Sequence, residues 1–376
     1  MRGALGQSLR ARPTPRLEFG SLHETLIIAG VATVLVIRTQ LWLTHYPQLG
    51  GHGLHIAHLL WGGLFMLLAI GLLLTFLGRA VVRAAAVIGG VGFGFFIDEL
   101  GKFVTEDNNY FYRPAAAVIY LIFVGLFLLT RALQRREGGR LSTQARVANA
   151  VELLGEAARH TLDESERRRA LALLQDADPA EPLVAPLRSL FQGLQARPAA
   201  APGLTARTLA GAHQTWARFA AWPRFATCVS WLLGIWAAVS LVGVVELITG
   251  SVVNVGGGHP GYVSDRLGDL AFVNLASLAS SAVSAVLVAR GVVHLRRGAR
   301  AAAYRDFEHA LLVAILVTQV FSFVESQFAA VFGLAVDLVL LVALRAVQAN
   351  DPATYAAALP APRGVTRALR PASAGP

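Results

Sequence analysis

Long apolar runs alternate with short polar loops along most of this chain. A helix that crosses a lipid bilayer needs about 20 mostly apolar residues. Eight runs meet that requirement, at residues 24–44, 55–78, 84–104, 114–133, 226–248, 269–290, 307–324 and 328–347. One helix over 307–347 would be about 60 Å long, roughly twice the hydrocarbon core, so we expect a break at Glu325-Ser326-Gln327. The pattern predicts an all-α, polytopic membrane fold with about eight transmembrane helices.

A polar segment, residues 134–225, separates the fourth run from the fifth. It contains three short amphipathic stretches, at 146–160, 164–175 and 184–195, and the sequence Thr161-Leu-Asp-Glu164 is typical of a capping box before the second of them. About 60 ordered residues form only a small core. We therefore expect a helical insert that leans on the membrane part or on a protein partner bound through residues 140–200.

The chain divides into five predicted regions, and its two membrane regions share short matches. The regions are a basic tail (1–23), a first membrane half (24–133), the insert (134–225), a second membrane half (226–348) and a disordered tail (349–376). Arg131-Ala-Leu-Gln134 matches Arg345-Ala-Val-Gln348, and Phe96-Ile-Asp98-Glu99 resembles Phe323-Val-Glu325-Ser326. The matches indicate two parallel four-helix repeats, as in some transporter folds; convergent apolar composition is the alternative.

Composition and charge support a membrane protein and argue against nucleic acid as a partner. The chain is 55% hydrophobic and 15% charged, with a mean hydropathy of +0.54, whereas soluble domains carry about 25% charged residues. The net charge of +10 comes from arginines in loops between apolar runs. Most arginines of the short loops lie on the side of the N-terminus, which predicts cytoplasmic termini. The single cysteine, Cys228, excludes an intrachain disulfide.

Charged residues gather near one end of the first predicted spans. Gly90, Gly94 and Asp98 are spaced by four, so they share one helical stripe, and small residues on it allow close helix packing. A hairpin with its turn near 79–83 places His58 at the level of Gly101–Lys102. Arg38 falls in the same layer. Glu325 also lies near the end of its predicted span. Asp337, in the middle of the eighth predicted span, is the ionisable residue deepest in the membrane.

Three interpretations of this layer stay open. In the first, Arg38 and Lys102 neutralise Asp98 and Glu99 and hold the helices together, because an unpaired buried charge is costly. In the second, the layer is part of a proton, ion or substrate pathway, since ionisable groups at membrane depth often mark function. Its residues are Arg38, His58, Asp98, Glu99, Lys102 and Glu325. In the third, His55, His58 and Asp98 bind a divalent metal, because histidines at i and i+3 can share ligation.

The segment FGFFIDELGKFVTEDNNYFYRPA, residues 93–115, resembles one shared by bacterial multispan membrane proteins with no assigned activity. The resemblance is strongest over residues 55–133. It implies a location in the bacterial plasma membrane and transfers no catalytic residue.

We expect a non-enzymatic membrane function without a cofactor. The most specific version of this prediction is transport, or the handling of protons or ions. The alternatives are a metal-dependent membrane enzyme and an assembly protein that recruits a partner through the insert. Zinc-dependent hydrolases of the alkaline ceramidase type need a late His-x-x-x-His pair, and rhomboid-like proteases need a Gly-x-Ser element. The chain contains neither the late histidine pair nor a Gly-x-Ser that continues as Gly-x-Ser-Gly or Gly-x-Ser-x-Gly.

Overall fold

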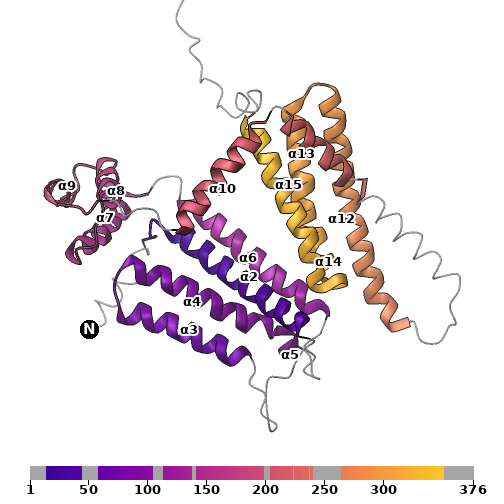
Figure 1. The fold of residues 1–376 in the computed structure, drawn as a ribbon, viewed down its shortest axis with the longest axis horizontal. Coiled ribbons are helices and arrows are strands. Elements are labelled where there is room, and N and C mark those ends of the chain that lie inside the picture. The colour runs from indigo at the N-terminus through magenta and orange to yellow at the C-terminus, as the bar shows by residue number, and fades with distance from the viewer. Residues whose placement is uncertain are drawn as a thin grey trace, which may run out of the picture. The chain divides into compact units, whose positions relative to one another are not determined.

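The computed structural model describes residues 14–44, 58–104, 113–137, 141–198, 204–222, 224–236, 238–239 and 264–350. In this part of the chain the regular structure is helical, with one isolated bridge between Asp163 and Arg197. The all-α prediction is therefore confirmed (Figure 1). The chain forms two compact units, residues 1–205 and 206–376, so the predicted insert region contributes to both.

Six helical stretches of the described residues are long and apolar enough to cross a membrane. They are Phe19–Leu41, His58–Thr75, Arg79–Lys102, Pro114–Arg136, Leu275–Arg296 and Arg300–Ala349. Large apolar side chains are exposed along them: Leu74 and Phe332 are each about four-fifths exposed. Contiguous exposed apolar surface of this kind is favourable in lipid and costly in water. The chain is a polytopic helical membrane protein.

The first unit contains α2 (Phe19–Leu43), α3 (His58–Thr75), α4 (Arg79–Asp98), α5 (Leu100–Val104) and α6 (Arg113–Glu137). Helix α4 packs against both α2 and α3, and α6 packs against α2 (Figure 1). The four predicted spans are present, but α4 begins five residues before the predicted start. The turn between α3 and α4 is at Gly78, whose φ of 121° suits glycine, and not at 79–83.

Glycines bring α4 into backbone contact with both of its neighbours. A Cβ atom on Gly90 would lie 2.4 Å from the carbonyl oxygen of Leu26 in α2, and one on Gly94 would lie 2.6 Å from that of Gly30. On another face, a Cβ atom on Gly92 would lie 2.8 Å from the carbonyl oxygen of Gly62 in α3. The predicted close packing of the Gly90–Gly94 stripe is confirmed, and it turns Asp98 toward α2.

The insert forms three helices with a small core of their own: α7 (Thr143–Ala158), α8 (Glu164–Gln175) and α9 (Val184–Gly193). All three correspond to predicted amphipathic stretches. The predicted capping box at Thr161–Glu164 is wrong by two residues. Asp163 caps α8 and exchanges hydrogen bonds with Glu166, because the Thr161 hydroxyl instead donates to the Glu156 carboxylate at the end of α7.

The second unit contains α10 (Leu204–Ala220), a helical segment at Phe225–Trp236, α12 (Ser264–Arg296), α13 (Arg300–Val313), a π-helical turn η1 (Ala314–Thr318), α14 (Gln319–Ser326), a 3₁₀ turn η2 (Gln327–Ala329) and α15 (Ala330–Asn350). Residues 237 and 240–248 of the predicted fifth span, and the predicted tail from residue 351, lie outside the described residues. The apolar part of α12 corresponds to the sixth span, shifted by six residues.

The seventh and eighth spans form a hairpin. The chain reverses at Gln327, whose φ is 51°. Arg345 on α15 then pairs with Glu308 on α13 at 3.0 Å, and Gln348 donates to the Tyr304 carbonyl. These contacts require α15 to run antiparallel to α13, so the expected break at Glu325-Ser326-Gln327 is confirmed. Phe307, Leu311 and Leu344 lie in the core of this unit.

The repeat stays a prediction. Both matched sequences place an arginine in an ion pair: Arg131 of α6 with Glu24 of α2, and Arg345 of α15 with Glu308 of α13. Helix α2 is the first span of its half, whereas α13 is the third of the other half. The partner helices therefore occupy non-equivalent positions, which gives the repeat no support.

Candidate functional site

Arg38 and Asp98 form a buried ion pair between α2 and α4. The Arg38 Nε lies 2.7 Å from the Asp98 Oδ1, and its Nη2 donates to the Asp98 carbonyl oxygen at 2.9 Å. The Asp98 side chain is fully buried. Helix α4 ends at this residue, so the guanidinium also satisfies a carbonyl at the helix end.

Glu99 is fully buried beside Asp98 but points to different partners. Its Oε1 lies 3.3 Å from both the backbone nitrogen and the Nδ1 of His58, and its Oε2 lies 2.7 Å from the Lys102 Nζ. The helix breaks at Glu99, between α4 and α5, which directs the two adjacent carboxylates toward different helices. The carboxylate also faces the positive N-terminal end of α3, a favourable position for an anion.

The structure brings five of the predicted site residues together, namely Arg38, His58, Asp98, Glu99 and Lys102, here called the charged layer. His58 lies level with Glu99 and not with Gly101–Lys102, because the turn before α4 comes earlier than predicted. Lys102 pairs with Glu99, one of the two carboxylates that it was expected to neutralise. Glu325 is exposed on α14 of the second unit, so its participation stays a prediction.

The geometry of the charged layer favours the ion-pair interpretation. Each carboxylate has a cationic partner within 3 Å, and buried charges persist where such partners and hydrogen bonds compensate their desolvation. Among the described residues, no group of three histidine, cysteine or acidic side chains could hold a metal ion. His55 lies outside them, so the metal site formed by His55, His58 and Asp98 stays a prediction.

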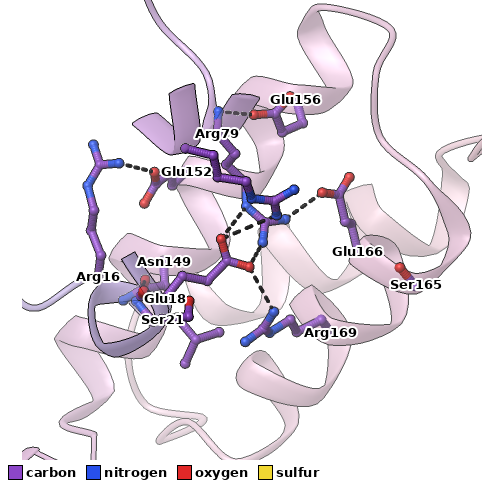
Figure 2. Close-up of polar contacts among 12 residues, drawn as sticks. Arg16, Glu18, Ser21, Arg79, Asn149, Glu152, Glu156, Ser165, Glu166 and Arg169 are labelled. Carbon is purple, nitrogen blue, oxygen red and sulfur yellow. Dashed lines mark hydrogen bonds and ion pairs between the residues drawn. The ribbon is translucent and has the colours of Figure 1, made fainter. Parts of the chain in front are cut away.

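A second polar assembly joins the insert to the ends of the apolar helices. We call it the Arg79 cluster: Glu18, Arg79, Glu156, Glu166 and Arg169 (Figure 2). The Arg79 guanidinium, at the first residue of α4, contacts Glu18 before α2 and Glu166 of α8. Its backbone nitrogen donates to the Glu156 Oε1 of α7 at 2.9 Å. Arg169 binds Glu18 at 3.1 Å. One arginine thus connects three separate segments.

Asn149 reinforces this joint from α7. Its side-chain oxygen accepts from the Leu17 backbone nitrogen at 2.7 Å, and its nitrogen donates to the Pro15 carbonyl at 3.1 Å. Both bonds hold the segment that leads into α2. The insert therefore leans on the membrane part, one of the two arrangements expected from the sequence. Binding of a partner through residues 140–200 stays a prediction.

The joint is expected to weaken in acid. Burial acts to raise the pKa of Glu156, but hydrogen bonds from Thr161, the Arg79 backbone and Arg159 outweigh it, so its folded pKa lies below the ordinary value. A depressed carboxyl pKa contributes stability that is complete above the unfolded pKa, about 4.3. That stability is lost as pH falls through the folded pKa. Hydrogen exchange of α7 and α8, corrected for intrinsic rates, should show this loss of protection.

Glu156→Gln serves as the comparison, because glutamine keeps the acceptor oxygen but does not titrate. Other acids of the joint, including Asp163 with its own lowered pKa, titrate equally in both proteins. A wild-type pH profile that superimposes on that of Glu156→Gln would show that Glu156 contributes nothing.

Asp337 is the buried carboxylate of the second unit and has a different environment. It is the eighth of the 21 residues of α15, inside an apolar span, and is 4% exposed. Its Oδ1 accepts from the Trp236 Nε1 at 2.9 Å, and its Oδ2 accepts from the Gln319 Nε2 at 2.8 Å. Both donors are neutral. Among the described residues, no cationic side chain lies within ion-pair distance of Asp337.

Asp337 lies in a cleft of about 470 Å³ within the second unit, here called the Asp337 cleft. Its described lining residues are Leu232, Ile235, Trp236, Val239, Ser281, Ser284, Ala314, Thr318, Gln319, Ser322, Gly333, Val336, Asp337 and Leu340. Asp337 is the ionisable member of that set. The π-helical turn η1 precedes Gln319 and contributes Ala314 and Thr318. Such turns are rare and are frequent at functional sites.

Sequence reasoning recognised Asp337 as the deepest charge but did not select it as a site. Its partners Trp236 and Gln319 come from two other predicted spans, and helix packing alone decides that they meet. One usable signal was present: Ser280, Ser284, Thr318, Gln319 and Ser322 place polar groups within apolar helices. Polar side chains in such helices commonly face one another and not lipid.

Comparisons with protein-family models, with curated proteins and with solved structures give no match. The geometry of the charged layer, the Arg79 cluster and the Asp337 cleft therefore carries the functional inference.

Proposed function

We propose that this protein transports a proton or another small cation across the bacterial plasma membrane, with both termini cytoplasmic and without enzymatic chemistry. Asp337 is the group that binds the cation. The charged layer, for which a pathway was one of three interpretations of the sequence, holds the first unit together. The Asp337 cleft thus replaces the charged layer as the site of transport.

The observation that supports this proposal is the Asp337 carboxylate, which lies inside an apolar span. Among the described residues, it accepts hydrogen bonds from neutral donors alone. An ionised acid in an apolar span is costly, and such residues usually mark ion pathways or proton relays. Asp98 shows how the same chain compensates a structural carboxylate, with a guanidinium at 2.7 Å. Asp337 lacks that compensation among the described residues, so a proton or cation from the cleft can supply it.

Proton flux in proteoliposomes tests the proposal. Vesicles loaded with a pH-sensitive dye are given a potassium diffusion potential with valinomycin, and internal pH is followed. We expect the wild-type protein to move protons faster than protein-free vesicles. Asp337→Asn should reduce that flux at least about tenfold, because a single essential proton carrier is lost. Asp337→Glu should retain part of it.

Glu308→Gln is the matched control, because Glu308 is a carboxylate of the same unit that pairs with Arg345 outside the cleft. Its flux should equal that of the wild type. Equal flux for Asp337→Asn and Glu308→Gln would refute a role for Asp337. Wild-type vesicles that behave like protein-free vesicles would refute proton transport.

A further inference from the structure

One buried hydrogen-bond acceptor among the residues that line the Asp337 cleft has no donor in the described part of the chain. The Gln319 side chain is 7% exposed, and its Oε1 is buried without a hydrogen-bond partner among the described residues. Its Nε2 donates to Asp337. The opposite amide orientation would set the Oε1 against the ionised carboxylate, so the observed orientation is the favourable one. A buried acceptor left unpaired is costly and indicates a missing donor.

Much of the cleft wall is apolar, although the hydroxyl side chains of Ser281, Ser284, Thr318 and Ser322 also line it. Leu232, Ile235 and Val239 line one side along the helix that carries Trp236, and Val336 and Leu340 flank Asp337 on α15. A volume of about 470 Å³ falls within the range of about 300–1,000 Å³ typical of small-molecule sites. A bare cation would fill a small part of it. The walls suit an organic group that stays in contact with them.

We infer that the cleft binds a small amine, with an ammonium group at Asp337 and an apolar body against the walls. This inference rests on the proposed function and identifies its substrate class. The ammonium group supplies the positive charge that is missing among the described partners of the Asp337 carboxylate. Its N–H groups donate to Asp337 and to the Oε1 of Gln319, which satisfies both groups.

A free amine fits the cleft better than the headgroup of an aminophospholipid. Both offer a primary ammonium, but the lipid carries a phosphate close to it. The described lining of the cleft contains neither arginine nor lysine to receive that phosphate. An amine without an acidic group leaves no charge unpaired there.

Equilibrium binding of three matched probes to the full-length protein in phosphatidylcholine nanodiscs tests the inference. The probes are benzylamine, benzyltrimethylammonium, which is a cation without N–H groups, and benzyl alcohol, which is neutral. Empty nanodiscs correct for partition into lipid. We expect saturable benzylamine binding at least about tenfold tighter than that of either other probe, because benzyltrimethylammonium has no N–H donor and benzyl alcohol has neither a positive charge nor a second donor.

Two substitutions locate the binding site. Asp337→Asn and Gln319→Met should each weaken benzylamine binding about tenfold or more. Gln348→Met is the matched control, because Gln348 bonds to Tyr304 and Glu308 outside the cleft. Its benzylamine binding should equal that of the wild type.

Nanodiscs that include phosphatidylethanolamine test whether a lipid headgroup occupies the cleft. Unchanged benzylamine affinity supports a free amine, and weakened affinity supports a competing headgroup in the same site.

The wild-type comparison decides the inference even where a substitution prevents folding. Equal affinity for the three probes, or no saturable benzylamine binding, would overturn the amine assignment. If proton flux nevertheless depends on Asp337, the proposed function stands and the ligand class is wrong. If benzylamine binds at Asp337 and the wild-type protein shows no proton flux, the amine site is correct and proton transport is refuted.

Discussion

Replacing Arg38 with methionine is expected to lower the free energy of unfolding by about 3–5 kcal/mol. The substitution leaves the Asp98 carboxylate fully buried without its guanidinium partner and removes the donor to its carbonyl. Breaking a buried ion pair from one side costs far more than the pair itself contributes. Unfolding by sodium dodecyl sulfate in mixed micelles, followed by circular dichroism, measures the change.

Two controls separate this effect from a general loss of charge. Arg131→Met removes a half-exposed arginine paired with Glu24 and should cost at most about 1 kcal/mol. The double substitution Arg38→Met with Asp98→Leu removes both charges and should recover most of the lost stability. If Arg38→Met costs no more than Arg131→Met, the charged layer does not stabilise the first unit.

Gly90→Ala is expected to be the next most damaging substitution, with a loss of about 1–3 kcal/mol or more. The added methyl group would lie 2.4 Å from the carbonyl oxygen of Leu26 and 2.8 Å from the Cβ of Ala29. Backbone atoms cannot rotate away as a flexible side chain can, so α2 and α4 must separate. The same separation would lengthen the Arg38–Asp98 contact. Unfolding in mixed micelles again gives the magnitude.

Gly63→Ala provides the matched control, because a Cβ atom at Gly63 has no neighbouring atom within 4 Å. Alanine also favours helix over glycine by about 1 kcal/mol, so Gly63→Ala should be neutral or stabilising. Similar stability for Gly90→Ala and Gly63→Ala would contradict the close approach of α2 and α4.

The fold of the first unit was largely predictable because apolar periodicity and glycine spacing act locally. The Gly90–Gly94 stripe, the inward direction of Asp98 and the common level of Arg38 and His58 all follow from helix geometry. The predicted alignment of α3 with α4 was wrong by about three residues, because it depended on the position of the turn between them. That turn is at Gly78, whereas the prediction placed it in the following residues, between Arg79 and Arg83.

The Asp337 cleft was not predictable because its parts are distant in sequence. Trp236 and Asp337 are 101 residues apart, and Gln319 approaches through the π-helical turn before it. Asp98 and Glu99 attracted more weight because they are adjacent and have charged neighbours in sequence. Lys102, three residues along the chain, neutralises Glu99, whereas Arg38, 60 residues away, neutralises Asp98. The sequence thus identified the charged groups correctly but could not show which carboxylate stayed uncompensated.

Proton flux measured side by side for two variants tests the central claim most directly. One is Asp337→Asn, and the other is the double substitution Arg38→Met with Asp98→Leu, which removes the buried pair of the charged layer. Our account predicts that the double variant, once folded and reconstituted, keeps wild-type flux and that Asp337→Asn loses it. Loss of flux in the double variant with wild-type flux in Asp337→Asn would contradict the account and place transport in the charged layer.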